Sequence, residues 1–285
     1  MSLQHILGLD HVVVTVRDLD SAAAQWRALG FTVSPRGTHS PILGTGNYTI
    51  MFGEDYVELL GILTETEQNK PTRDYLAKRE GLERAAFTTD DAAAGAEELK
   101  SRGIEALGPI HFGRPVELPG GGTGEARFNV IRWPLGEQPG GLRIFACQHL
   151  TRETVWIPEL LEHANGAKRI IRLEVLAADP KAAAEHLGRL IDEPARAEGD
   201  AWLVPSGGKR ADILFYDDAA FAQRYPQAAR DGAAPEGAVA LVVATTDIAA
   251  APASLGGTAT AHNGALSVAA SAANGIIVSF LPEPA

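Results

Sequence analysis

The sequence predicts an α+β fold in which four βαβββ modules pair into two half-barrels. Two observations support this prediction. A short apolar strand segment, an Ala-rich helical segment and three further strand segments follow one another, and this order restarts three times along the chain. Short sequence similarities also recur at an offset of about 160 residues, which indicates that the second half repeats the first.

The first module begins with residues 9–16, which are mostly β-branched and typical of a buried strand. Asp18 or Asp20 can cap the next helix, since apolar residues then recur at helical spacing up to residue 29. Gly30 is placed to end that helix. Three further strands are expected at residues 31–34, 48–52 and 56–62.

The pattern restarts at residues 82–89, a strand after which Asp90 or Asp91 can cap a helix that ends at Gly103. Residues 113–125 are rich in Gly and Pro, and we expect a long loop there, of the kind that often forms a functional flap. The other strands of this module are expected at residues 104–107, 127–133 and 142–147. Two later modules are expected to start with strands at residues 169–177 and 238–245.

The short polar stretch 163–168 is the expected boundary between the two halves. It divides the chain into a first domain of residues 1–163 and a second domain of residues 168–285.

Composition excludes several classes of protein. The chain is 45% hydrophobic and 21% charged, with a formal net charge of -11 and no basic stripe, so nucleic acid is not an expected partner. The single cysteine, Cys147, rules out an internal disulfide framework. The N-terminus lacks a signal-peptide pattern, and no apolar run is long enough to span a membrane. We therefore expect a cytoplasmic protein that does not enter a membrane.

Several motifs resemble the glyoxalase-like branch of the vicinal oxygen chelate superfamily, which includes glyoxalases, bleomycin-resistance proteins and extradiol dioxygenases. The resemblance covers roughly residues 8–155, and extends over 168–285 only through the order of elements. It implies that paired modules curve into a cup where a divalent metal often binds two substrate oxygens, with ligands from the first and last strands of each module. The motifs are Leu9-Asp10-His11-Val12-Val13-Val14, Asp18-Leu19-Asp20, Leu29-Gly30-Phe31, Tyr56-Val57-Glu58-Leu59-Leu60-Gly61 and Phe145-Ala146-Cys147-Gln148-His149, with His39 and the turn Gly44-Thr45-Gly46-Asn47.

Strand alternation places His11 and Glu58 on the cup side of their strands. An imidazole and a carboxylate suit Zn, Fe, Mn or Ni, and a carboxylate in an apolar strand needs a partner. The two residues are thus the predicted metal pair, and Glu58 could double as a catalytic base, as the resemblance implies. A buried hydrogen-bonded pair without metal is the alternative.

The second module departs from this pattern. Counting from the glycines that precede its strands places Arg84 at the position of His11 and Phe145 at the position of Glu58, although counting from the helix caps gives Glu83 instead of Arg84. Arg and Phe are not metal ligands. An inward arginine is suited to hold a carboxylate or phosphate, and a salt bridge to Glu58 is the alternative.

A third metal ligand would have to come from His39, His149 or Cys147. His39 could equally be a surface residue, His149 could cap a strand end, and Cys147 could be a small core residue. In the second half, residues 171–173 and Leu241 occupy the positions of His11, so we expect a degenerate pair of modules there.

Three functions remain open from the sequence. The first is a metal-dependent lyase, isomerase or dioxygenase that acts on a small oxygen-rich substrate in the cup of residues 1–163. The second is a metal-free protein that binds small molecules or drugs, with Tyr56, Phe145 and Trp133 stacking on the ligand and Asn47 in the pocket wall. The third is a scaffold with a vestigial pocket. A divalent metal cofactor and the absence of any cofactor are equally defensible from the sequence. The chain could also form a homodimer.

Overall fold

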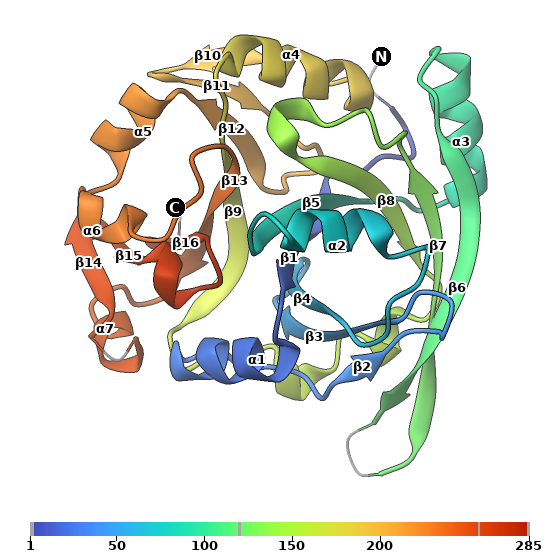
Figure 1. Cartoon of the computed structure of the whole chain (residues 1–285), viewed down its shortest axis with the longest axis horizontal. Coiled ribbons are helices and arrows are strands. Elements are labelled where there is room, and N and C mark those ends of the chain that lie inside the picture. Colours follow the sequence, from blue (N-terminus) through green and yellow to red (C-terminus); the bar gives the residue numbers. More distant parts are fainter. Residues whose placement is uncertain (1–2, 119–120, 256, 284–285) are drawn as a thin grey trace.

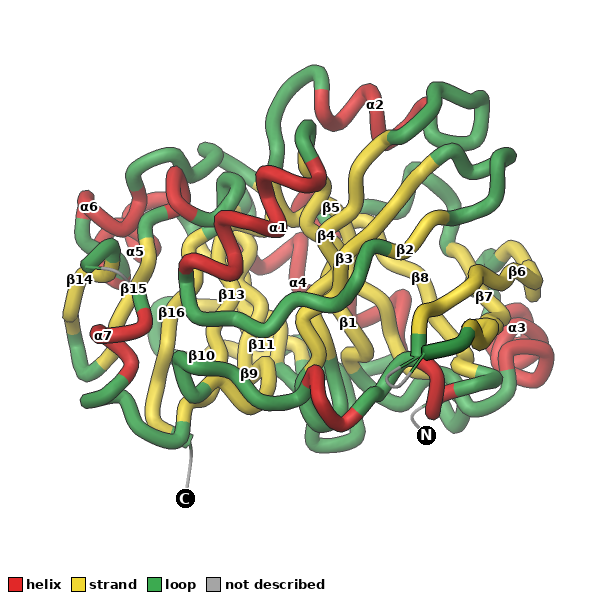
Figure 2. Tube along the Cα trace, turned by 90° about the horizontal axis from the view of Figure 1, so that it is seen from below, coloured by secondary structure: helices red, strands yellow, loops and turns green. Residues whose placement is uncertain are grey.

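The computed structural model describes residues 3–118, 121–255 and 257–283. It contains two eight-stranded sheets that lie side by side (Figures 1 and 2). The first sheet has the strand order β2-β3-β4-β1-β5-β8-β7-β6, and the second has the equivalent order β10-β11-β12-β9-β13-β16-β15-β14. Four βαβββ modules in two pairs are therefore confirmed.

The first sheet and its helices form the N-terminal half. Its elements are β1 (Leu9–Val16), α1 (Leu19–Ala28), β2 (Gly37–Thr38), β3 (Thr45–Met51), β4 (Tyr56–Ile62), α2 (Lys70–Leu76), β5 (Gly81–Thr88), α3 (Ala92–Ser101), β6 (Leu107–Glu117), β7 (Thr123–Arg132) and β8 (Arg143–His149), with short 3₁₀ turns at Pro139–Gly141, Arg152–Thr154 and Pro158–Leu160.

The second sheet repeats this arrangement. Its elements are β9 (Ala167–Leu176), α4 (Pro180–Ile191), β10 (Arg196–Glu198), β11 (Ala201–Val204), β12 (Asp212–Tyr216), α5 (Asp218–Arg224), α6 (Gln227–Arg230), β13 (Gly237–Thr245), α7 (Ala251–Ser254), β14 (Ala259–His262), β15 (Ala265–Val268) and β16 (Ile277–Pro282), with a 3₁₀ turn at Ala270–Ala272.

The helices begin where the sequence predicts. The carboxylate of Asp18 accepts a hydrogen bond from the backbone N–H of Ser21, and Asp91 and Asp179 cap α3 and α4 in the same way. Gly30 has a φ of 79°, the left-handed conformation that ends α1 at little steric cost.

The main hydrophobic core lies between the sheets and their helices and includes residues of both halves. Val12, Val14 and Val16 of β1 pack into it and leave the other face of the strand to the cup. The carboxylate of Asp55, between β3 and β4, accepts a hydrogen bond from the backbone N–H of Ile170 on β9 at 3.0 Å. The two halves are thus bonded as well as packed together.

Three local predictions were wrong. Residues 31–34 form no strand, and the short strand β2 follows them instead. The strand expected at residues 104–107 begins only at Leu107, as β6. Most of the expected loop 113–125 belongs to the long hairpin of β6 and β7, in which Arg114 pairs with Ala126. Cross-strand pairing stabilises this Gly- and Pro-rich segment, and local composition does not reveal such long-range partners. Within the described residues, no helix is long and apolar enough to cross a membrane.

Candidate functional site

The first sheet curves around a cavity of about 420 Å³. Its wall combines an apolar cluster, which includes Tyr56, Phe128 and Cys147, with polar side chains from β1, β4, β5, β7 and β8. The cup that the fold predicts is therefore a hollow with an apolar floor and a polar wall, large enough for a small molecule.

Strand pairing places two pairs of residues at equivalent positions around this cavity. Val13 on β1 pairs with Glu58 on β4 and with Arg84 on β5. Ala86 on β5 pairs in the same way with Phe145 on β8 and with His11 on β1. The pseudo-twofold relation between the modules thus makes Arg84 the counterpart of His11 and Phe145 the counterpart of Glu58.

His11 and Glu58 face each other across the module 1 side of the cavity. His11 Nε2 lies 3.9 Å from Glu58 Oε2. Asn47 Nδ2 donates to the other oxygen of Glu58 at 2.6 Å, and the ring of Tyr56 stacks on His11 with ring centroids 4.2 Å apart. Glu58 is consequently held in one orientation, with 12% of its side chain exposed.

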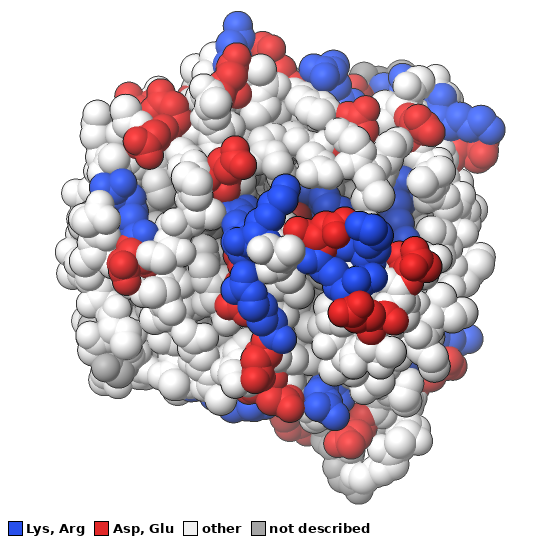
Figure 3. Space-filling model, in the orientation of Figure 1, with Lys and Arg blue, Asp and Glu red and all other residues white. Residues whose placement is uncertain are grey.

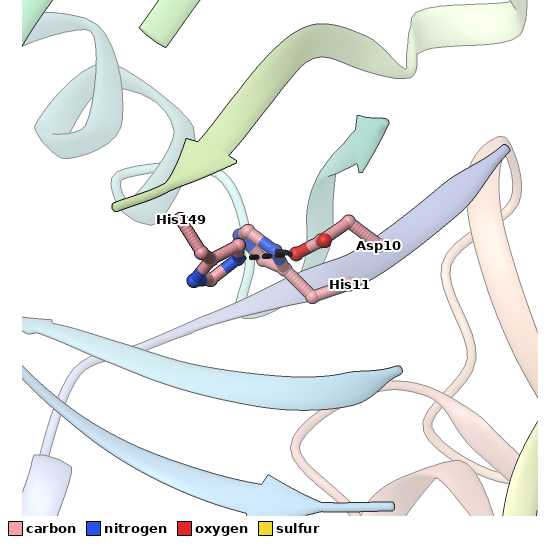
Figure 4. A group of neighbouring side chains, drawn as sticks. All are labelled: Asp10, His11 and His149. Atoms are coloured by element: carbon pink, nitrogen blue, oxygen red, sulfur yellow. Dashed lines mark hydrogen bonds and ion pairs between the residues drawn. The ribbon is translucent and has the colours of Figure 1, made fainter. Parts of the chain in front are cut away.

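Asp10 lies directly behind His11 (Figure 4). His11 Nδ1 is 2.6 Å and His149 Nε2 is 2.9 Å from the same oxygen of Asp10, and the hydroxyl of Thr88 donates to the other oxygen. Burial alone would raise the pKa of Asp10, but the neighbouring His149 and His11 lower it well below its usual range. Asp10 is therefore a buried carboxylate that fixes the ring of His11.

A β-bulge explains how Asp10 and His11, which are neighbours in the sequence, come to contact each other through their side chains. The pairing of β1 with β5 passes from Leu9 to His11 and skips Asp10. Such a bulge re-aims a side chain, which strict strand alternation would have turned to the opposite face.

Arginines form the module 2 side of the cavity. Arg84 and Arg143 both bond to the buried carboxylate of Glu83, and Arg84 also donates to the hydroxyl of Thr72 at 3.0 Å. Arg132 and Arg114 line the same cavity. Figure 3 shows basic side chains gathered around a hollow near the middle of the molecular face, with acidic side chains beside them.

Besides Cys147, which belongs to the apolar cluster of the wall, the structure brings eight of the nine other residues that the sequence singles out into the wall of this one cavity. Of the less certain candidates, Trp133 lines the wall although its indole donates to the backbone of Leu190. His39 lines it as well, bonded to the hydroxyl of Thr45, and burial lowers its pKa. The eight residues are His11, His39, Asn47, Tyr56, Glu58, Arg84, Trp133 and Phe145.

His149 is the exception, because it lies outside the cavity wall, behind the apolar floor. Its ring is enclosed by Tyr56, Phe128 and Trp156, and it contacts Asp10.

Sequence reasoning missed Asp10 and the arginines other than Arg84. Arg143 is two residues from Phe145 on the same strand, so alternation alone could have identified it. Arg114 was not identified because residues 113–125 were expected to form a loop. Arg132 was not identified because the pairing of β7 was not known from the sequence.

Two groups of side chains could be considered for a metal. In the first, ligand atoms of Asp10, His11 and His149 all lie within 4.8 Å of one another. Two imidazoles and a carboxylate suit several divalent ions, so this donor set fits one. Since Asp10 and His149 do not line the cavity, an ion held there would lie behind His11 and away from the substrate.

The second group would use the cavity side of His11, with Glu58 and His39. The guanidinium groups of Arg84 and Arg114 share this cavity and would repel a dication. This donor set therefore fits a resident metal poorly, although it suits a ligand that carries negative charge.

The second cup differs from the first. At its centre lies Glu174, fully buried and bonded to Arg224 and to the hydroxyl of Tyr225. Tyr225 packs in an apolar cluster with Phe221 and Leu214. The side chains at this place thus differ from the His11 and Glu58 of the first half.

Paired βαβββ modules that surround a polar cavity define the class of protein: the chain has the vicinal oxygen chelate fold. It belongs to the glyoxalase-like domain family, whose model matches residues 9–191. No curated protein gives a significant match.

Solved structures agree on the fold. A hypothetical protein from Staphylococcus aureus is 15% identical, with a TM-score of 0.69 over 96% of this chain and 98% of that one. A variant of 4-hydroxymandelate synthase from Streptomyces coelicolor is 14% identical, with a TM-score of 0.59 over 97% of this chain and 92% of that one. At these identities the likeness extends to the fold and not to the reaction.

Proposed function

We propose that this chain is an enzyme that binds a small oxygen-rich molecule in the first cup and moves a proton on it with His11 and Glu58. The observation that supports the proposal is the geometry of this pair. His11 Nε2 and Glu58 Oε2 lie 3.9 Å apart at the cavity wall. Asp10 contacts the other nitrogen of His11, and Asn47 donates to the other oxygen of Glu58. Positioned acids and bases of this kind are how proteins transfer protons.

The chemistry that suits the pair is enolisation. Glu58 takes a proton from a carbon next to a carbonyl group, and the electron pair of that C–H bond moves to the carbonyl oxygen. His11 Nε2 donates a hydrogen bond to this oxygen, while Asp10 holds the ring through Nδ1. Return of the proton to the face that it left restores the substrate, whereas protonation of the opposite face completes an epimerisation. Atoms and charges balance in both cases without a redox partner.

A divalent ion at Asp10, His11 and His149 is compatible with this proposal. When bound there, it would fix the ring of His11 and draw charge from it. The ion content of purified protein tests this directly. Loss of stoichiometric metal in His149→Ala but not in Glu58→Gln identifies the buried group, and the reverse pattern identifies the cavity group.

A metal-free binding protein is the second candidate, and the aromatic wall favours it. Phe112 and Phe128 stack with ring centroids 5.0 Å apart, and Phe145 lies edge-on to His11. Aromatic faces of this kind can hold a flat ligand.

Turnover separates the two candidates. The protein is incubated in D₂O with small 2-oxo and 2-hydroxy acids, and NMR follows exchange of the C–H next to the carbonyl or the appearance of an isomer. We expect exchange with at least one compound. Tight binding of aromatic ligands that are recovered unchanged, together with no exchange on any compound, would favour the binding protein.

A further inference from the structure

Three arginines form a row across neighbouring strands on the inner face of the first cup. Arg84 on β5 pairs with Arg143 on β8. Arg132 on β7 pairs with Phe145, which lies two residues beyond Arg143 on the same face. All three side chains line the cavity.

One buried carboxylate, that of Glu83, neutralises one of these three positive charges. Glu83 receives hydrogen bonds from Arg84 and Arg143 and from the hydroxyl of Thr15, and it is only 1% exposed. Among the described parts of the chain, Arg132 has neither a hydrogen bond nor an ion pair through its side chain. The row therefore has an excess of two positive charges.

Other carboxylates of the cavity wall do not neutralise the row. Glu58 is bonded to Asn47 on the opposite side, Glu137 is bonded to His186, and Glu67 is exposed at the mouth. Burial, together with the charges of Arg84 and Arg132, lowers the pKa of Arg143. Arg84 and Arg143 are partly buried and Arg132 is exposed, so like charges gather at the cavity wall, which costs free energy unless a ligand of opposite charge enters.

We propose that this row binds a dianionic oxyanion group of the substrate, either a phosphate monoester or a pair of carboxylates. Guanidinium groups match such oxygens with parallel hydrogen bonds, and the excess of two charges matches a dianion. The inference rests on the proposed function, since it places the anionic end of the substrate in the cup that holds His11 and Glu58.

The surroundings of the row indicate where the rest of the substrate lies. Leu107 and Leu135 line the same cavity and are each 53% exposed, so part of the mouth of the cup is apolar. Glu58 on β4 and Arg84 on β5 are both paired with Val13, so they lie on the two sides of β1, the strand that carries His11. A dianion on the row would thus leave the rest of the substrate in the same cavity as His11 and Glu58.

Calorimetric titration tests the inference with inorganic phosphate, succinate and acetate at constant ionic strength. The test variant is Arg132→Gln, and the matched control is Arg127→Gln. Arg127 is on the same strand, but its side chain is exposed on the opposite face. We expect phosphate or succinate to bind more tightly than acetate, and the better of the two identifies the kind of dianion.

In Arg132→Gln the dissociation constant for that dianion should rise by about tenfold to a hundredfold, as expected for loss of hydrogen bonds from a charged group. Arg132→Lys should restore part of the affinity, and Arg127→Gln should bind like the wild type. Equal binding of all three anions, or an equal dissociation constant in Arg132→Gln and Arg127→Gln, overturns the inference.

Glu58→Gln separates this inference from the proposed function. It should bind the dianion like the wild type but lack exchange of the C–H. If the wild type exchanges C–H but binds no dianion, the inference fails and the proposed function stands. If the dianion binds but no compound exchanges, the proposed function fails and the inference stands.

Discussion

Asp10 and Glu83 are counterparts in the two modules of the first cup. Each is a buried carboxylate in a bulge between β1 and β5, skipped by the strand pairing. Each accepts a hydrogen bond from a threonine of the opposite strand: Thr88 donates to Asp10 at 2.9 Å, and Thr15 donates to Glu83 at 2.6 Å.

The same local arrangement therefore holds two different kinds of basic side chain. Asp10 orients the imidazole of His11, and Glu83 orients the guanidinium groups of Arg84 and Arg143. One module of the cup presents a group that can exchange protons, and the other presents groups that remain positively charged. This division of the cup is what both of our proposals rest on.

Asp10→Asn should destabilise the protein by about 3 kcal/mol at neutral pH, because it removes the charge that His11 and His149 both face in a buried place. Urea unfolding measures the change, and Asp200→Asn, an exposed site, is the control.

The effect of Asp10→Asn has a defined pH dependence. The pKa of Asp10 is lower in the folded chain than the value of about 3.9 expected when unfolded. The carboxylate thus contributes its full stabilisation above about pH 4 and loses it as the pH falls through the folded pKa. The difference in the free energy of unfolding between wild type and Asp10→Asn should shrink below that pH. Equal stability of Asp10→Asn and the control Asp200→Asn at pH 7 would contradict this role.

Asp55 should make stability depend on pH in the opposite sense. Burial raises its pKa to about 7, so the folded chain holds a proton that the unfolded chain releases near pH 3.9. Stability from this group is therefore complete at low pH and declines as the pH rises from about 4 to about 7.

Asp55→Asn keeps an oxygen that can accept from the N–H of Ile170 and removes this titration. Relative to the wild type, the variant should gain stability between pH 5 and pH 8 in urea unfolding. If the difference in the free energy of unfolding between Asp55→Asn and the wild type stays constant over that range, Asp55 does not titrate there.

Arg224→Leu should destabilise the second half by about 3–5 kcal/mol, since it removes the hydrogen-bonded cation of the fully buried carboxylate of Glu174 and leaves only Arg172, 3.7 Å away. The double variant with Glu174→Gln should recover part of that loss, and Arg196→Leu, at an exposed position, serves as the control. Binding of phosphate or succinate in the first cup should not change. Loss of that binding in a folded Arg224→Leu protein would mean that the second half takes part in the site.

The sequence predicts the paired modules and several residues of the cavity wall, because helix caps and strand alternation are local properties. Counting from the glycines before each strand correctly makes Arg84 the counterpart of His11 in the second module, and Phe145 the counterpart of Glu58. It cannot predict the bulge at Asp10, since alternation turns that residue away from the cup.

The arginine row was hidden for a related reason. Whether Arg132 lies next to Arg143 depends on the register of β7 against β8, which is set by long-range pairing rather than by local sequence.

The exchange rate of Glu58→Gln tests the central claim most directly. The variant retains the shape of the side chain but cannot take a proton, and Glu97→Gln on the exposed face of α3 is the matched control. On any 2-oxo or 2-hydroxy acid that the wild type exchanges in D₂O, we predict that the rate in Glu58→Gln falls roughly 10²–10⁴-fold, with dianion binding unchanged. Exchange in Glu58→Gln as fast as in Glu97→Gln would contradict a role of Glu58 in proton transfer.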